Sequence, residues 1–272
     1  MLLVAITVFC YSISSVSDKQ ISGKLKCRQE EFAFIISTST AIWLGLVLLF
    51  TGWEIEITLH NMILTFLLAV CKTAEFYTSA ILLKTISVYE LKAWLGVNIS
   101  VSYFYNFYVG KADIEIIAVI FCILLLMGIW MILWSDKNRK KTFLLCTAFI
   151  LSKFLYGILV GMVSSGCSQT TVLFIVMLVV AAAQMPKISL RQVIKKEKIS
   201  FAFLSRLPNA IGLLTEAAAA VQNIFLYAMI QPIQLLILFI YSLMKKEDMP
   251  KMKFWGSVFC IFAVCIITIE IY

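Results

Sequence analysis

Two opposite charges stand in the middle of a long apolar run. The run LLAVCKTAEFYTSAILL covers residues 67–83 and contains Lys72 and Glu75. Side chains three positions apart share one face of a helix, so these two can form an ion pair. In a bilayer, one charge at the centre of a spanning helix costs about 2.5–3.5 kcal/mol on insertion scales. Such a pair is therefore typical of a site that faces a protein-lined, partly wet cavity and binds a charged solute or a proton.

Two further apolar stretches carry polar side chains with helical spacing. Lys153 and Tyr156 are three positions apart in one of them. Arg206, Asn209 and Glu216 occupy the other. At about 100° per residue these three side chains fall within about 80° of one another and form a polar stripe. Basic residues on such stripes are expected to meet anionic groups of a solute, and the acids to balance them or to carry a coupling proton.

The segment around Trp94 adds a fourth group. Glu90 and Trp94 are four positions apart, and Lys92 points about 200° away from Glu90 toward a different neighbour. Trp94 and Tyr156 are candidates for stacking on a ring or a cation. The predicted solute-binding residues are Lys72, Glu75, Lys92, Trp94, Lys153, Tyr156, Arg206, Asn209 and Glu216. The alternative is that Lys72 pairs only with Glu75 to pack helices, while Arg206 and Glu90 extend to a membrane interface.

The elements that position these residues are apolar stretches of about twenty residues, the length that spans a bilayer as a helix. The chain is 62% hydrophobic and 14% charged, with a mean hydropathy of +0.97. This composition predicts an all-α membrane protein with ten transmembrane helices. The predicted spans are 2–21, 31–51, 59–84, 87–110, 113–134, 142–163, 168–186, 199–222, 224–243 and 251–271. The first stretch is expected to remain as a span rather than to be removed as a signal peptide, because it lacks a basic leading segment.

Lysine and arginine alternate between the joints that connect these stretches. They concentrate in residues 19–28, 137–141, 187–198 and 245–253, and are absent from 52–58 and 164–167. The positive-inside rule assigns the basic joints to the cytoplasm, which places both termini outside. The net charge of +8 is then expected to contact lipid headgroups rather than nucleic acid.

The two halves of the chain, 1–136 and 137–272, resemble each other. FCI occurs at 121–123 and again at 259–261, and KTAEFYTSAILL at 72–83 aligns with RLPNAIGLLTEA at 206–217. Five spans in each half make equivalent helices run in opposite directions, in agreement with the alternating basic joints. We therefore predict two inverted five-helix repeats, an arrangement that commonly builds transporters with a solute site near the midplane.

Three segments carry a resemblance to a known family. They are VSDKQISGK at 16–24, the segment from QPIQLL to IITI at 231–269, and YELKAWLGVNISVSYFYNFYVGK at 89–111. The pattern resembles the drug/metabolite transporter superfamily, specifically its EamA-like bacterial branch. The resemblance implies a ten-helix transporter in a bacterial inner membrane. Members of that superfamily are often described with both termini in the cytoplasm, which is the reverse of the orientation that the basic joints predict.

The expected function is secondary transport of a small polar or charged metabolite by alternating access, coupled to protons or working by exchange. The alternative is a lipid-linked flippase or a partner subunit of a surface-polymer system with the same fold. An enzyme is not expected, because His60 is the one histidine and the sequence has neither HExxH nor GxSxG. Neither a cofactor nor a metal is expected. The expected partners are a small-molecule solute and the lipid bilayer.

Overall fold

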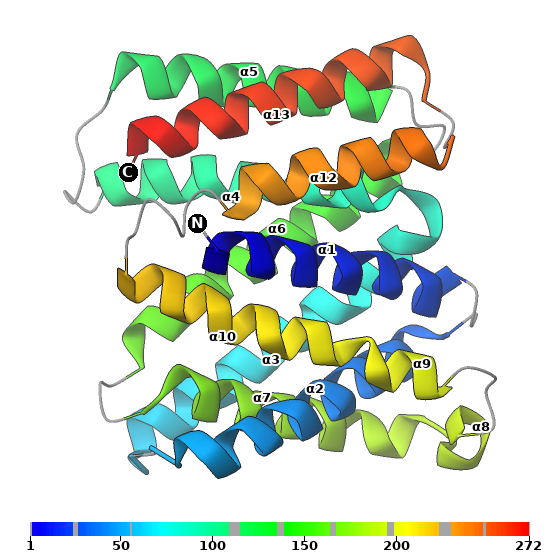
Figure 1. Cartoon of the computed structure of the whole chain (residues 1–272), viewed down its shortest axis with the longest axis vertical. Coiled ribbons are helices and arrows are strands. Elements are labelled where there is room, and N and C mark those ends of the chain that lie inside the picture. The colour runs from blue at the N-terminus through cyan, green and yellow to red at the C-terminus, as the bar shows by residue number, and fades with distance from the viewer. Residues whose placement is uncertain are drawn as a thin grey trace. The chain divides into compact units, whose positions relative to one another are not determined.

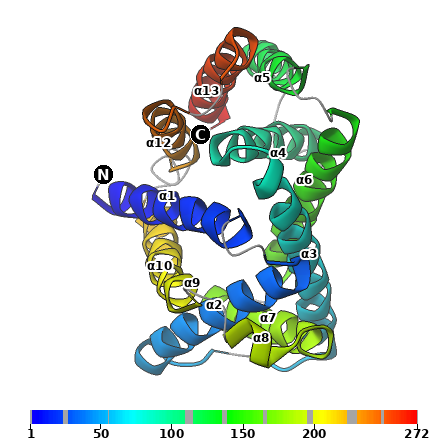
Figure 2. The ribbon, with the colours of Figure 1, turned by 90° about the vertical axis from the view of Figure 1, so that its right-hand side faces the viewer.

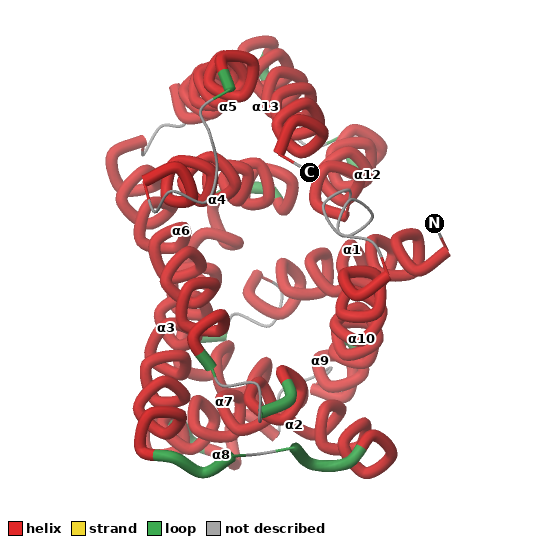
Figure 3. Tube along the Cα trace, turned by 90° about the vertical axis from the view of Figure 1, so that its left-hand side faces the viewer, coloured by secondary structure: helices red, strands yellow, loops and turns green. Residues whose placement is uncertain are grey.

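Helices joined by loops make up the part of the protein that the structure describes, and no strand occurs among those residues (Figures 1 and 3). The structure is a computed structural model. It describes residues 2–23, 27–54, 56–108, 115–134, 139–163, 167–194, 199–222, 230–246 and 249–271.

Nine of the ten predicted stretches are each occupied by one helix. These helices are α1 Leu2–Gly23, α2 Gln29–Thr51, α3 Leu59–Thr85, α4 Val88–Tyr108, α5 Ile116–Trp134, α6 Arg139–Met162, α7 Gln169–Gln184, α12 Ile230–Met244 and α13 Lys251–Ile271. The stretch 199–222 is instead divided into α9 Ile199–Leu204 and α10 Arg206–Gln222, so the prediction of one helix there is wrong. A short 3₁₀ helix, η1 Met185–Lys187, and α8 Leu190–Ile194 lie between α7 and α9.

Six helical segments within the described residues are long and apolar enough to cross a membrane. They are Leu2–Gly23, Gln29–Thr51, Leu59–Thr85, Ile116–Trp134, Arg139–Val160 and Gln169–Lys187. An apolar helix satisfies all its backbone hydrogen bonds internally, which is the requirement for backbone inside a bilayer. The remaining predicted spans stay predictions; α12, for example, is apolar but has only 15 residues.

The chain forms two compact units, and each unit contains segments from both halves of the sequence. Unit 1 comprises Met1–Ser12, Thr85–Ile150 and Ile211–Tyr272, and unit 2 comprises Ile13–Lys84 and Leu151–Ala210. Helices α1, α6 and α10 therefore contribute residues to both units, and α3 contributes its last residue, Thr85, to unit 1.

In unit 1, α5 and α13 lie side by side and antiparallel (Figure 1). Gly128 of α5 and Gly256 of α13 bring the two backbones into contact: a Cβ built on Gly256 would lie 2.6 Å from the Gly128 carbonyl oxygen. Farther along the same pair, the rings of Phe121 and Phe262 are 5.6 Å apart between centroids. Small residues that permit such close approach are typical of helix contacts within membranes.

We expect the variant Gly256→Ala to destabilise unit 1 by about 1–3 kcal/mol, because the added methyl group meets backbone atoms that cannot move aside within a packed helix pair. Titration of the purified protein with a denaturing detergent measures the free energy of unfolding. Gly157→Ala is the matched control, since a Cβ built on Gly157 meets no atom within 4 Å. Equal stability of the two variants would contradict the tight α5–α13 contact.

In unit 2, α2 and α7 pack antiparallel along their length (Figure 2). The Arg28 guanidinium, just before α2, donates to the Lys187 carbonyl oxygen at 3.4 Å, at the end of η1, which directly follows α7. At the other end, the Ser168 amide donates to the Glu54 carbonyl oxygen at 3.0 Å. Helix α3 is attached to α7 by a hydrogen bond from the Tyr77 hydroxyl to the Gln184 side-chain oxygen. Unit 2 holds most of the buried charged residues that the sequence singles out.

Candidate functional site

A charged cluster around the buried carboxylate of Glu75 joins α3 to α6 within unit 2. The two carboxylate oxygens of Glu75 each bind a different lysine: Oε2 is 2.9 Å from Lys72 Nζ, and Oε1 is 2.8 Å from Lys153 Nζ. Lys72 Nζ also lies 4.2 Å from the centroid of the Tyr156 ring, in the geometry of a cation–π contact. We call Lys72, Glu75, Lys153 and Tyr156 the Glu75 cluster.

Local helical spacing brings together the two members of the cluster that lie on each helix. Lys72 and Glu75 lie three positions apart on one face of α3, and Lys153 and Tyr156 are three positions apart on α6. Exposed fractions of the side chains are 11% for Lys72, 10% for Glu75 and 29% for Lys153. The cluster therefore contains two ammonium groups and one carboxylate, which leaves one positive charge in excess. Lysine 72 is held by both a carboxylate and a ring, whereas Lys153 is held by the carboxylate alone among the described residues.

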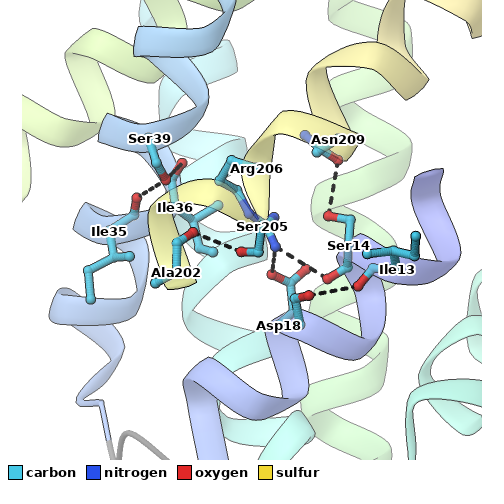
Figure 4. Close-up of polar contacts among 11 residues, drawn as sticks. Ile13, Ser14, Asp18, Ile35, Ile36, Ser39, Ala202, Ser205, Arg206 and Asn209 are labelled. Atoms are coloured by element: carbon cyan, nitrogen blue, oxygen red, sulfur yellow. Dashed lines mark hydrogen bonds and ion pairs between the residues drawn. The ribbon is translucent and has the colours of Figure 1, made fainter. Parts of the chain in front are cut away.

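A second buried cluster joins α10 to α1, also within unit 2 (Figure 4). Arg206 Nη2 donates to Asp18 Oδ1 and, at 3.2 Å, to the Ser14 carbonyl oxygen. The Ser14 hydroxyl makes a long hydrogen bond of 3.5 Å to Asn209 Oδ1. We call Ser14, Asp18, Arg206 and Asn209 the Arg206 cluster. Its two charges balance each other.

Arg206 is nearly inaccessible. Its side chain is 3% exposed, against 25% for that of Asp18. Its Nε is buried and makes no hydrogen bond with the residues that the structure describes. An unsatisfied buried donor costs about 1–3 kcal/mol, so an atom that accepts from this Nε would stabilise the cluster.

The break between α9 and α10 positions Arg206. Helix α9 ends at Leu204, where the Ser205 amide donates to the Phe201 carbonyl oxygen at 2.9 Å and the Ser205 hydroxyl donates to the Ala202 carbonyl oxygen at 2.8 Å. Helix α10 then begins at Arg206, and Pro208 lies in its first turn. Proline is tolerated there because it lacks an amide hydrogen that would have no partner within the helix. The break therefore puts the guanidinium at the start of α10, against α1.

The structure assembles the predicted residues into separate groups. Lys72, Glu75, Lys153 and Tyr156 form one cluster, and Arg206 and Asn209 belong to another. Lys92 and Trp94 lie on α4 in unit 1, where Trp94 is buried with its ring 6.1 Å from that of Phe143. The side chain of Glu216 lies outside the described residues.

Arg206 and Glu90, which the alternative extends to a membrane interface, are both buried within the protein. Glu90 lies in the first turn of α4, where its Oε1 accepts from the Ser87 amide at 3.1 Å and from the Ser87 hydroxyl. In return, the Glu90 amide donates to the Ser87 hydroxyl oxygen at 3.4 Å, and this reciprocal pattern is a capping box, which satisfies amides at the start of a helix. Lys253 Nζ lies 2.8 Å from the same oxygen. Glu90 is thus part of the α4 cap and of its contact with α13.

Asp18 is a member of the site that sequence reasoning did not select. The signal was available, because Asp18 is an acid at the end of the first apolar stretch, four positions from Ser14 on the same helical face. An ionisable residue inside an apolar helix is a candidate for function wherever it occurs.

Both clusters can bind ions through charge-assisted hydrogen bonds. The ammonium, guanidinium and carboxylate groups exchange partners without covalent chemistry. Among the residues that the structure describes, no group of three or more His, Cys, Asp or Glu side chains could hold a metal ion.

No protein-family model matches the sequence, and a comparison with curated proteins finds no match. The helices themselves define the class: over the residues that the structure describes, the protein is all-α and has six helices long and apolar enough to cross a membrane, as in a multi-pass membrane protein. Its distinguishing feature is charge buried where two such apolar helices meet, as at α3 and α6.

Proposed function

We propose that this protein is a secondary transporter that moves a small polar or charged metabolite across a membrane by alternating access. The observation that carries the proposal is the pair of charged clusters in unit 2, each built around a buried charged residue, Glu75 in one and Arg206 in the other. Ionisable residues inside apolar spanning helices are costly, and they mark pathways for solutes and ions. The two clusters use ion pairs and hydrogen bonds, which a solute can replace reversibly as the helices move.

The proposed architecture is ten transmembrane helices in two inverted five-helix repeats. Such a repeat makes equivalent helices antiparallel. The repeat would make α2 equivalent to α7, and α5 equivalent to α13. In each of these two pairs the helices pack against each other and run antiparallel. Each compact unit also combines segments from both halves of the chain. These contacts favour the repeat over chance similarity of apolar sequence.

The two clusters correspond to each other under this repeat. Lys72 and Arg206 are 134 positions apart, and Asp18 and Lys153 are 135 positions apart. The contact of α3 with α6 through Lys72, Glu75 and Lys153 is therefore the counterpart of the contact of α10 with α1 through Arg206 and Asp18. An inverted repeat produces paired contacts of this kind on either side of its axis, where transporters bind their solutes.

The remaining parts of the proposal follow the resemblance to the EamA-like branch. It implies a bacterial inner membrane and a function without cofactor or covalent chemistry. A lipid-linked flippase or a partner subunit with the same fold would have the same clusters but a different ligand. Transport measurements separate these alternatives.

The variants Lys72→Ala and Arg206→Ala are expected to lower solute transport about 30-fold or more. Truncating one partner of a buried charged pair costs about 2 kcal/mol or more, and each 1.4 kcal/mol is tenfold. A thermal-stability screen with amino acids, choline-like cations, sugar phosphates and nucleotide sugars identifies the solute, since a ligand at 100 times its Kd adds about 2.7 kcal/mol of stability. Uptake of that solute into proteoliposomes then measures transport.

The control is Lys141→Ala, which removes an exposed lysine from the first turn of α6. Membrane insertion and thermal unfolding of each variant establish that it is folded. Normal transport by both Lys72→Ala and Arg206→Ala would refute the assignment of the clusters. Movement of a lipid, with no uptake of any soluble compound, would favour the flippase.

A further inference from the structure

The Glu75 cluster has no carboxylate oxygen that is not already bound to an ammonium group. Oε1 of Glu75 binds Lys153 at 2.8 Å and Oε2 binds Lys72 at 2.9 Å. A solute that brings its own ammonium group would meet a carboxylate shared by two cations. The attraction of the carboxylate would be offset by repulsion from both lysines. The cluster therefore disfavours a cation, and gives the ammonium group of a zwitterion no acceptor of its own.

The same cluster has hydrogen-bond donors to offer, and they belong mainly to Lys153. An ammonium group has three N–H donors. Within the described part of the chain, Glu75 Oε1 is the contact that holds Lys153 Nζ, and 29% of the Lys153 side chain is exposed. Lys72 is less available, since it is 11% exposed and is fixed between Glu75 and the Tyr156 ring. Lys153 is thus the cation that a ligand can reach.

Among the described residues, Glu75 is the one carboxylate paired with Lys72 and Lys153, so the excess positive charge of the cluster calls for a further anion. The Arg206 cluster does not provide one, because its carboxylate, Asp18, is already paired with Arg206. An unbalanced charge is expensive in apolar surroundings, and a bound anion removes this cost. One negative charge would leave each ammonium group of the Glu75 cluster with its own counter-ion.

We propose that the Glu75 cluster binds the negatively charged group of an organic anion, such as a carboxylate, and that Lys153 is the residue that anchors it. This inference rests on the proposed transport function and names its substrate class. It selects an anion over the zwitterionic and cationic metabolites that a mixed-charge site could otherwise take.

Three probes with one phenylethyl skeleton test the charge preference directly. They are 3-phenylpropionate, an anion; phenylalanine, a zwitterion; and 2-phenylethylamine, a cation. The thermal unfolding temperature of the purified full chain is measured against each probe at constant ionic strength and neutral pH. We expect half-maximal stabilisation by the anion at a concentration at least tenfold lower than for the other two. Because the apolar part is identical, such a difference reports charge alone.

Variants locate the response. Lys153→Met should lose stabilisation by 3-phenylpropionate, Lys153→Arg should retain it, and Lys141→Met, which removes an exposed lysine from the same helix, should leave it unchanged. Glu75→Gln should bind the anion more tightly, since it removes the carboxylate that competes for both lysines. Lys153→Glu should transfer the preference to 2-phenylethylamine. The wild-type comparison remains decisive if a variant does not fold.

The anion site would be refuted if phenylalanine or 2-phenylethylamine stabilised the protein as much as 3-phenylpropionate or more. It would also be refuted if Lys153→Met kept its response to 3-phenylpropionate. No response to any of the three probes up to about 10 mM, ten times the upper end of ordinary KM values, would refute it as well. Proteoliposome uptake separates this failure from failure of the transporter. Binding of the anion without uptake would keep the site and refute transport. Preferred uptake of phenylalanine would keep transport and refute the anion site.

Discussion

Replacing Asp18 with alanine is expected to lower the free energy of unfolding by about 3–5 kcal/mol, because it leaves a buried charge without its counter-ion. The side chain of Arg206 is 3% exposed, so water does not replace the lost carboxylate. Its remaining contact in the cluster is the hydrogen bond to the Ser14 carbonyl oxygen at 3.2 Å. Titration with a denaturing detergent measures the loss.

Replacing the other member of the ion pair, Arg206, provides an internal control. Arg206→Ala should cost less than Asp18→Ala, since the Asp18 side chain is 25% exposed and can be hydrated. The double variant Asp18→Leu with Arg206→Met should recover most of the stability, because an apolar pair of similar volume has no desolvation cost. A larger loss from Arg206→Ala than from Asp18→Ala would contradict the burial described for this pair.

Replacing Glu75 with alanine is expected to destabilise the protein by a similar amount, about 3–5 kcal/mol. Two ammonium groups, Lys72 and Lys153, would then face each other without the carboxylate that binds both. Thermal and detergent unfolding in a buffer without organic anions provide the measurement. We expect Glu75→Gln to be milder, since the amide keeps an oxygen that can accept from one lysine.

A second substitution tests whether charge is the cause. Adding Lys153→Met to Glu75→Ala removes one of the two unbalanced charges, so part of the lost stability should return. Adding Lys141→Met to Glu75→Ala instead removes an exposed lysine from α6, the helix of Lys153, and should recover none of the lost stability. Equal behaviour of the two double variants would mean that Glu75 acts through packing rather than through its charge.

The helices could be predicted from the sequence because backbone inside a membrane must satisfy its own hydrogen bonds, as a helix does. Apolar stretches of sequence therefore indicate which segments are helical. The exception is instructive. Apolar residues continue on both sides of Ser205 in the stretch 199–222, so hydropathy alone does not locate the break there. The local signal was Pro208, whose ring favours the first turn of a new helix over the interior of a continuous one.

The site was predictable where its contacts are local. Lys72 and Glu75 are three positions apart, and helical spacing alone brings them together. The contact of Glu75 with Lys153 depends on how α3 packs against α6, which no local pattern specifies. For the same reason, the sequence indicated Arg206 as a charged residue in an apolar helix but not its partner Asp18, 188 positions away. The partner of Glu90, Lys253, lies in a distant helix, so the sequence left open whether Glu90 faces the protein interior or a membrane interface.

The composition of the two units has a consequence for biosynthesis. A chain leaves the ribosome from its N-terminus, so α1 to α3 enter the membrane well before α6 to α10. Unit 2 needs residues as far as Ala210, and unit 1 needs the C-terminal segment that begins at Ile211. In the interval, Asp18 is a carboxylate in an apolar helix whose partner Arg206 has not yet been synthesised. The ion pair that joins α1 to α10 can therefore form only after 188 further residues have been added to the chain.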